Sequence, residues 1–256
     1  MRRAAAVIGL LALLFAPLTS ADAGPFSNWA AVVVAGDFHA HSGRPTEAFD
    51  NARRDVAKTL VDLGFDKTAI QQFSVRPQRY RADSPGRSDA RTIYEALRTK
   101  AQTAKAGCLF YISSHGGPEG ALLGEDVLRP NLLAAMLNDA CPDRPSVVVI
   151  SACFSGVFVA PLQKSDRLIL TAARADRASF GCGESNRYPY FDACFLSSAS
   201  QAHDFSSLGA AVQACVARKE RETGAEPASE PQVWIGPALR PLLPLYAFDR
   251  TKPKTP

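Results

Sequence analysis

The chain has 256 residues, of which 46% are hydrophobic and 21% are charged, and its formal net charge is +4. Lysine and arginine are scattered among acidic residues, a pattern typical of a solvated surface, so the charge does not favour a nucleic-acid-binding protein. The length and the apolar content suit one α/β domain of ordinary size with a substantial core.

The N-terminal segment has the organisation of a secretory signal peptide. Arg2 and Arg3 precede an apolar stretch, and residues 21–23 (ADA) are small, as at a cleavage site. The apolar stretch is shorter than the ~20 residues that a membrane span needs, so an uncleaved anchor is the weaker alternative. We predict that residues 1–23 are removed, that the protein is secreted or periplasmic, and that it has no stable membrane association afterwards. Its net charge would then be +3, because residues 1–23 carry two arginines and one aspartate.

Apolar strands alternate with amphipathic helices along the rest of the chain. Residues 29–36 (WAAVVVAG) are a continuous apolar run closed by glycine, as expected for a strand buried on both faces of a parallel sheet. A helix is predicted over residues 46–65, between Thr46, which can cap its start, and Gly64, which can end it. Further strands are expected at 69–75, 108–114, 146–152, 167–173 and 232–236, and further helices at 89–104, 130–140, 190–201 and 207–223.

This alternation predicts an α/β fold with an open, mainly parallel sheet and helices on both faces, which is a three-layer sandwich. No internal repeat or low-complexity linker divides the chain, so residues 24–245 are expected to form one domain. Residues 246–256, which end in DRTKPKTP, are predicted to be a disordered tail.

All six cysteines lie beyond the predicted signal peptide, and an oxidising compartment permits disulfides. If Cys153 is a free nucleophile, at most two bridges form and one further thiol stays unpaired. We expect Cys108 to pair with Cys141, since both lie just before predicted neighbouring strands, and Cys182 to pair with Cys194. No CxxC spacing is present, so neither a zinc site nor a thiol redox protein is favoured.

Two apolar runs end in reactive side chains. FYISSHGGPEG (residues 110–120) carries His115 at its strand end, and SVVVISACFSG (146–156) carries Cys153 at the equivalent place. One strand-helix-strand crossover separates them, so the two strands are expected to be neighbours. Because ligands bind at the carboxyl ends of parallel strands, the two side chains are expected to approach each other at that edge.

The glycines after His115 have a physical use. Gly116 and Gly117 let the backbone come close to a substrate, and a backbone N–H there can join that of Cys153 in stabilising an oxyanion. A helix beginning directly after Cys153, or a protonated His115, would make the thiol more acidic. Taken alone, the histidine reads as a surface residue and the cysteine as a small core side chain, but together they favour catalysis. SHGGPEG lacks the features of a phosphate-binding loop.

These motifs resemble the legumain family of cysteine endopeptidases, which has the caspase-like fold. That family carries apolar residues followed by His-Gly at one strand end and by Ala-Cys at the next. Here FYISSHGG and VVVISACFSG match this pattern. WAAVVVAG is similar to the first strand of the family and TAARADRASFGC to a later segment, and YPYFDACF with EPQVWIGP resembles its secreted bacterial members. The resemblance therefore covers most of residues 24–245.

The resemblance implies a cysteine endopeptidase with peptide or protein substrates. Cys153 would be the nucleophile that forms an acyl-enzyme, His115 would act as a base or, chiefly, protonate the leaving amine, and Gly116 would donate to the oxyanion. It implies no cofactor and no metal.

The resemblance also suggests how the residue before the cleaved bond (P1) is read. Arg44 and Asp192 match two charged residues of the family's P1 pocket, but Ser151 stands where the family has an acid two residues before the nucleophile. Ser151 and Ser179 can still accept a hydrogen bond. Because loss of that acid leaves the pocket more positive, we predict cleavage after Asn or Asp, with neither favoured strongly.

A further departure concerns the orientation of His115. The family often has an asparagine two residues before the pocket arginine, and this chain has Ser42 there. His41 and Asp37 are near enough in sequence to substitute for it, although a surface role suits them equally well. The two departures keep open a second hypothesis, a catalytically inactive peptide-binding module with the same fold. The intact His115, Gly116 and Cys153 favour the enzyme.

Overall fold

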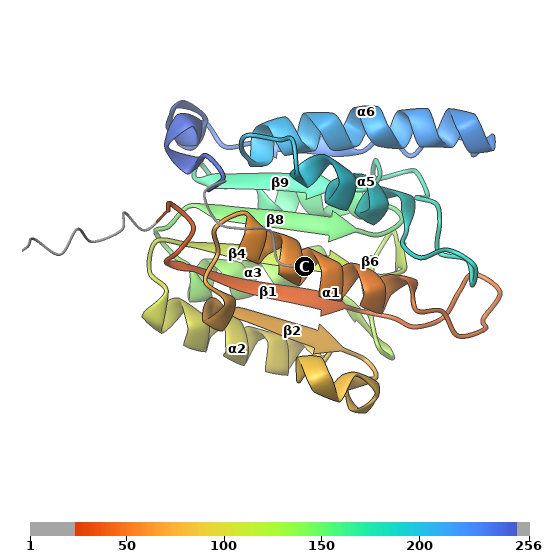
Figure 1. The fold of residues 1–256 in the computed structure, drawn as a ribbon, viewed down its shortest axis with the longest axis horizontal. Coiled ribbons are helices and arrows are strands. Elements are labelled where there is room, and N and C mark those ends of the chain that lie inside the picture. The colour runs from red at the N-terminus through yellow and green to blue at the C-terminus, as the bar shows by residue number, and fades with distance from the viewer. Residues whose placement is uncertain (1–23, 250–256) are drawn as a thin grey trace, which may run out of the picture.

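The computed structural model describes residues 24–249, so the predicted signal peptide and most of the predicted tail lie outside the described residues. Its core is a seven-stranded sheet in the order β10-β9-β8-β4-β1-β2-β3, in which β10 runs antiparallel to β9 and the other pairs are parallel (Figure 1). The strands are β1 (Trp29–Ala35), β2 (Ile70–Ser74), β3 (Gly86–Arg87), β4 (Gly107–Ser113), β8 (Ser146–Ser151), β9 (Arg167–Thr171) and β10 (Gln232–Ile235).

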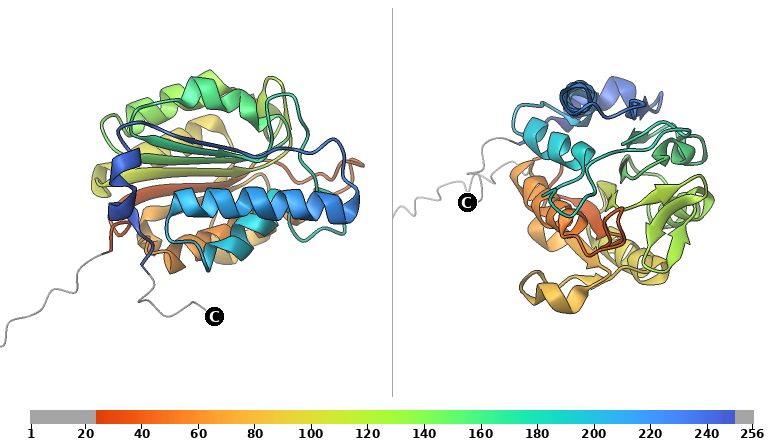
Figure 2. Two further views of the ribbon diagram at one scale, coloured as in Figure 1. Left: turned by 90° about the horizontal axis from the view of Figure 1, so that it is seen from above. Right: turned by 90° about the vertical axis from the view of Figure 1, so that its right-hand side faces the viewer.

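Helices cover both faces of this sheet (Figure 2). α1, α5 and α6 pack on one face, and α2, α3 and α4 pack on the other. The α/β three-layer architecture predicted from the sequence is therefore confirmed. The helices are α1 (Ala48–Asp62), α2 (Ala90–Thr103), α3 (Pro130–Ala140), α4 (Val159–Leu162), α5 (Tyr190–Ala199) and α6 (Phe205–Thr223). A small antiparallel sheet of β5 (Gly116–Gly117), β6 (Gly120–Leu123) and β7 (Asp126–Leu128) follows β4.

The apolar strand sequences follow from this layering. Successive side chains of a strand point to opposite faces, so a strand covered on both sides must be apolar throughout. In β1, Val33 packs in the core cluster beneath α1, α5 and α6, whereas Val32 and Val34 pack beneath α2 and α3. Tyr111 and Phe110 of β4 divide between the two clusters in the same way. All seven residues of β1 and of β4 are buried.

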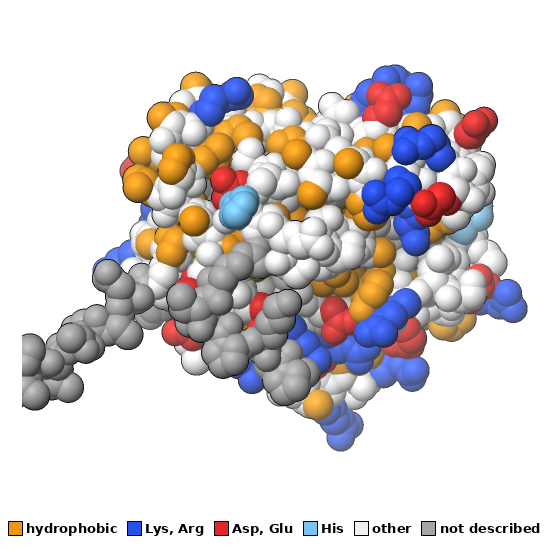
Figure 3. All heavy atoms as spheres, turned by 45° about the horizontal axis from the view of Figure 1, so that its top comes forward, with side chains coloured by type: hydrophobic (Ala, Val, Ile, Leu, Met, Phe, Trp, Pro, Cys, Tyr) orange, Lys and Arg blue, Asp and Glu red, His pale blue; other side chains and the backbone are white. Residues whose placement is uncertain are grey.

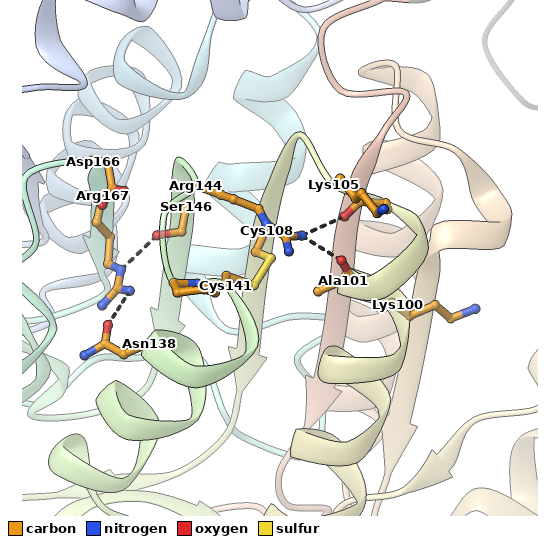
Figure 4. Close-up of a disulfide and its surroundings, with 12 residues drawn as sticks. Lys100, Ala101, Lys105, Cys108, Asn138, Cys141, Arg144, Ser146, Asp166 and Arg167 are labelled. Atoms are coloured by element: carbon orange, nitrogen blue, oxygen red, sulfur yellow. Dashed lines mark hydrogen bonds between the residues drawn. A yellow bond between two sulfur atoms is a disulfide. The ribbon is translucent and has the colours of Figure 1, made fainter.

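The amino ends of the central strands are tied together (Figure 4). The predicted Cys108–Cys141 disulfide is confirmed and joins β4 to the end of α3. Arg144 donates to two carbonyl oxygens at the end of α2, at 2.7 and 3.3 Å. Arg167 at the start of β9 is almost fully buried and donates to the hydroxyl of Ser146 at 2.9 Å. The carboxyl ends of these strands lie at the opposite edge of the sheet, and the chain continues from them into loops.

The second disulfide differs from the prediction. Cys194 pairs with Cys215, so the expected Cys182–Cys194 bridge is wrong. Cys194 lies on α5 in the core cluster and faces α6, which carries Cys215, whereas Cys182 belongs to the loop before α5. Packing between the two helices decides the pairing, and nearness in sequence does not. Cys153 and Cys182 are free, as the predicted limit of two bridges required.

The domain extends beyond its predicted boundary at residue 245. A 3-10 helix spans Arg240–Tyr246, and Phe248 is buried, with ring centroids 4.9 Å from Phe205 and 5.8 Å from Phe26. Residues 246–249 are therefore part of the packed domain and do not belong to a disordered tail. Residues 250–256 lie outside the described part of the chain.

The surface mixes charges of both signs. On the face seen in Figure 3, Lys and Arg side chains lie beside Asp and Glu side chains. Within residues 24–249, no helix is long and apolar enough to cross a membrane. The same residues contain no cluster of His, Cys, Asp and Glu side chains arranged to hold a metal ion.

A buried carboxylate fastens α5 to the carboxyl ends of β4 and β8. Asp192 is fully buried and accepts hydrogen bonds from Ser151 at 2.6 Å, from Ser113 at 3.0 Å and from the hydroxyl of Tyr111. Burial raises the pKa of Asp192 to about 6, although the three hydroxyl donors act in the opposite direction. Ser113 and Ser151 are the last residues of their strands, so this carboxyl group is hydrogen-bonded to the carboxyl ends of both strands.

We expect Asp192 to make the stability of the fold depend on pH. An aspartate titrates near 3.8 in the unfolded chain and Asp192 at about 6 in the folded chain, so the folded state keeps a proton that the unfolded state loses between these values. The free energy of unfolding should therefore fall as pH rises from about 3 to about 7, by ~3 kcal/mol from this group. Asp192→Asn removes this contribution.

Urea unfolding of both proteins at pH ~4 and pH ~7 tests this expectation. Relative to the wild type, Asp192→Asn should gain ~2 kcal/mol between the two pH values. The exposed carboxylate variant Asp126→Asn is the control and should show no such gain. A constant difference between wild type and Asp192→Asn would contradict the assignment.

Candidate active site

The two reactive side chains singled out from the sequence follow neighbouring parallel strands. β4 and β8 pair directly, and the last residues in register are Ser113 and Ser151. His115 and Cys153 each come two residues after that pair. The same register therefore carries both residues to one edge of the sheet, and the predicted adjacency of the two strands is confirmed.

Gly116 lies directly against the backbone of the cysteine. A Cβ atom at this position would come within 2.3 Å of the carbonyl oxygen of Cys153 and 2.9 Å of the Cβ of Ala152. Those separations are far below van der Waals contact, so only glycine permits this approach. The contact brings the segment that follows His115 onto the segment that contains Cys153.

The hairpin after His115 orients the backbone N–H of Gly116. Leu122 donates its N–H to the carbonyl oxygen of His115 at 2.9 Å, and the next pair along the ladder is Gly116 with Ala121. Hydrogen-bonded and non-hydrogen-bonded pairs alternate in an antiparallel ladder, so the N–H of Gly116 points away from β6. Among residues 24–249 this N–H has no backbone acceptor outside the ladder, so it can donate to a ligand. The sequence interpretation treated this segment as a glycine-rich loop and did not foresee the hairpin.

A backbone carbonyl sets the proton position on His115. The Nε2 atom of His115 lies 2.9 Å from the carbonyl oxygen of His39. Since a carbonyl oxygen only accepts, Nε2 carries a proton, and the neutral ring keeps Nδ1 as its basic nitrogen. The ring also packs edge-on against Phe49, with centroids 5.1 Å apart. Neither His41 nor Ser42 makes this bond, so the carbonyl of His39 takes the place of the asparagine side chain that the resemblance implied.

The thiol of Cys153 is half-buried and interacts with Ser179. The backbone N–H of Ser179 donates to Sγ at 3.2 Å, and the carbonyl oxygen of Ser179 lies 3.4 Å from Sγ. The sulfur is therefore held between a donor and an acceptor of the same backbone residue. Among the described residues, no hydrogen bond joins the side chains of His115 and Cys153.

The predicted P1-binding arginine is paired with an acid that the sequence interpretation missed. Arg44 is 77% exposed, and its Nε donates to Glu184 at 2.6 Å. The hydroxyl of Ser42 donates to the same carboxylate oxygen at 2.5 Å. The bond from Ser42, followed by bonds from the backbone N–H of Glu184 and from Arg44, lowers the pKa of Glu184 to about 2. Glu184 is therefore ionised at all ordinary pH values.

The second free thiol belongs to the same edge of the sheet. Burial raises the pKa of the Cys182 thiol, and negative charge at Cys153 and at Asp37 raises it further. Cys182 therefore keeps its proton more firmly than an ordinary cysteine. It follows Ser179 in the loop that contacts the Cys153 sulfur.

The predicted site residues lie at one edge of the sheet, and they differ in how deeply their side chains are buried. Ser179 touches the sulfur of Cys153, and Arg44 lies at the exposed rim. Ser151 and Asp192 are buried beneath the edge and bond to each other. The two missed contributors, Glu184 and the carbonyl of His39, lie in loops, and no local motif marks either of them.

Comparison with known proteins places the chain in a family. A family model described as the Peptidase C13 family matches residues 88–225, which include both strand ends described above. No curated protein matches the chain.

A solved structure shows the same fold. The crystal structure of caspase-1 from Spodoptera frugiperda superposes with a TM-score of 0.59 at 16% sequence identity, over 84% of this chain and 88% of that one. At this identity the likeness concerns the fold alone, and it confirms the caspase-like architecture implied by the sequence motifs. Together with its match to the family model, this fold shows that the chain belongs to the Peptidase C13 family, the legumain-like cysteine peptidases with a caspase-like fold.

Proposed function

We propose that this cysteine peptidase is an exported endopeptidase that cuts peptide bonds after Asn or Asp through Cys153, His115 and an acyl-enzyme. The observation that carries the proposal is the seating of Gly116 against the backbone of Cys153 at the ends of paired strands. This contact gathers a nucleophile, a proton donor and two backbone N–H groups at one edge. Membership of a cysteine peptidase family supports the same chemistry.

The reaction follows from these groups. The Cys153 thiol passes its proton to Nδ1 of His115, and the sulfur forms a bond to the substrate carbonyl carbon. The carbonyl oxygen becomes an oxyanion that accepts from the N–H groups of Gly116 and Cys153. As the C–N bond breaks, Nδ1 of His115 gives its proton to the leaving amine. Water then attacks the thioester, which releases the acid product and restores the thiol.

The rim of the site supplies the proposed contacts to the P1 side chain. The terminal nitrogens of Arg44 can donate to the side-chain carbonyl of Asn or Asp, and the ionised Glu184 can accept from the amide N–H₂ of Asn. Ser179 lies beside the sulfur, where a P1 residue must enter. Ser151 and Asp192 form the buried floor beneath it. Export through the predicted signal peptide, which would bring the enzyme to peptide or protein substrates outside the cytoplasm, is part of the proposal.

Covalent labelling is the direct test of the nucleophile. Mature protein incubated with acyloxymethyl ketone probes that carry Asn or Asp at P1 should gain one probe mass on Cys153, as measured by intact-protein and peptide mass spectrometry. Cys153→Ala should gain none. Cys182→Ser, which removes the other free thiol, should be labelled like the wild type. Labelling that persists in Cys153→Ala, or no labelling by either probe across pH ~4 to 8, would favour the inactive peptide-binding module.

A pair of glycine substitutions tests the contact that carries the proposal. Gly116→Ala places a methyl group 2.3 Å from the Cys153 carbonyl oxygen, so the two segments must separate. We expect kcat/KM for an Asn or Asp peptide to fall about 100-fold, because small displacements of reacting groups have effects of this size. Gly117→Ala is the matched control, since its Cβ meets only a flexible Glu119 side-chain atom at 3.8 Å. Equal activity of the two folded variants would contradict the proposed geometry.

Glu184 should bias the choice between the two P1 residues. Because its carboxylate is ionised beside Arg44, it repels an Asp side chain and accepts from an Asn side chain. Glu184→Gln should raise kcat/KM for Asp peptides relative to matched Asn peptides by about fivefold, the size expected for one exposed charge contact. Glu125→Gln, at the exposed turn between β6 and β7, should leave the ratio unchanged. A ratio that does not move in Glu184→Gln would remove Glu184 from the P1 site.

A further inference from the structure

Asp37 makes an unusual set of contacts for a side chain outside the reacting groups. It follows the end of β1, its side chain is 8% exposed, and its Oδ1 atom accepts from the backbone N–H groups of Phe38 at 2.6 Å and of His39 at 3.1 Å. The Nδ1 atom of the His39 ring lies 2.9 Å from the same oxygen. One carboxylate oxygen thus gathers three nitrogens from the next two residues.

These bonds determine the course of the backbone through residues 37–39. A side-chain oxygen that accepts from the following two backbone N–H groups closes a local turn, and ionisation of the acceptor strengthens each bond. The turn ends at His39, whose carbonyl oxygen is the group that Nε2 of His115 contacts at 2.9 Å. Two hydrogen bonds, from the His39 N–H to Asp37 and from His115 to the His39 carbonyl, therefore link Asp37 to the catalytic imidazole.

The rest of the loop holds the outer side of the same turn. Thr46 donates its N–H to the carbonyl oxygen of Phe38 at 2.8 Å, and His39 forms a β-bridge with Pro45. The guanidinium of Arg76 lies 4.5 Å from the centre of the Phe38 ring and donates to the Thr46 carbonyl at 3.0 Å. Thr46 thus binds the carbonyl side of the same peptide group whose N–H donates to Asp37, so the two contacts hold this group from opposite sides.

We propose that Asp37 is a positioning residue for His115: its carboxylate fixes the turn that aims the His39 carbonyl at Nε2, and so keeps Nδ1 as the nitrogen that exchanges the catalytic proton. The inference rests on the proposed peptidase function, which it deepens. It also explains how the site works without an asparagine at position 42, where Ser42 instead bonds Glu184. Asp37 does not touch the substrate in this scheme.

Kinetics provide the first test. Asp37→Ala should lower kcat for an Asn or Asp peptide about 10- to 100-fold, the range seen when groups that orient a reacting side chain are removed, and should change KM less than about threefold. Asp126→Ala, on the exposed strand β7, is the control for loss of one surface carboxylate and should retain wild-type kcat. A wild-type kcat in folded Asp37→Ala would overturn the proposal.

The tautomer of His115 provides a readout that a purely structural role would not move. In Cys153→Ala protein at pH ~9, where an ordinary histidine is neutral, long-range ¹H–¹⁵N NMR spectra should show His115 as the Nε2–H tautomer. Adding Asp37→Ala should yield a mixture of both tautomers. The His115 signals are assigned by their loss in His115→Gln. An unchanged tautomer in the Asp37→Ala spectrum would overturn the proposal.

Two amide variants separate the position of the side-chain oxygen at residue 37 from its negative charge. They also test the proposal if Asp37→Ala does not fold. Asn keeps an oxygen at the same distance from the backbone, whereas Gln places it one methylene farther away. Asp37→Asn should therefore stay within about threefold of wild-type kcat and keep the Nε2–H tautomer, and Asp37→Gln should behave as predicted for Ala. Equal kcat and equal tautomer populations in these two variants would contradict the proposal.

The two hypotheses fail in different ways. If the wild type neither cleaves peptides nor reacts with the probes, the proposed function fails, yet the NMR comparison still reports whether Asp37 orients His115. If the wild type is active but Asp37→Ala and Asp37→Gln match it in kcat and tautomer, only the role of Asp37 is lost.

Discussion

The parallel pairing of β4 with β8 is the constraint on which the site depends. Because both strands end at the same level, at Ser113 and Ser151, the residues that follow must share one edge of the sheet. Gly116 then closes the distance, since its missing side chain lets one segment rest on the backbone of the other. The disulfide and the buried arginine secure the amino ends of the same strands. The reacting edge can therefore consist of loops without loss of register.

Both buried and exposed polar contacts stabilise this edge of the sheet. The Asp192 carboxyl group is fully buried beneath it and joins α5 to both strand ends, so its contribution is part of the core. The Arg44–Glu184 pair lies at the rim, where water screens it and an ion pair contributes little to stability. The exposed Arg44–Glu184 pair instead provides charged groups that a bound ligand can contact. The floor of the site is thus buried and hydrogen-bonded, and the rim is polar and open to solvent.

The six cysteines divide according to their surroundings. Four of them form two bridges inside the packed domain, and the two free thiols both belong to the reacting edge. Burial and neighbouring negative charge raise the pKa of Cys182, which keeps it protonated and therefore weakly nucleophilic. The Cys153 sulfur instead lies against the backbone of Ser179, which donates an N–H to it and presents a carbonyl oxygen to it. The two free thiols therefore differ in their surroundings, which composition alone does not show.

The sequence by itself determined the layers of the fold and the two strand ends that carry the proposed reacting residues. Burial on both faces makes strands continuously apolar, and a strand end is visible where such a run stops. His115 and Cys153 were found in this way. The Cys194–Cys215 bridge, the Glu184 partner of Arg44 and the hairpin after His115 were decided by the tertiary structure. Each depends on which distant segments or backbone groups meet, and such meetings leave no periodic pattern. The His39 carbonyl is the clearest case, since every residue type carries one and only the fold selects which of them reaches the histidine.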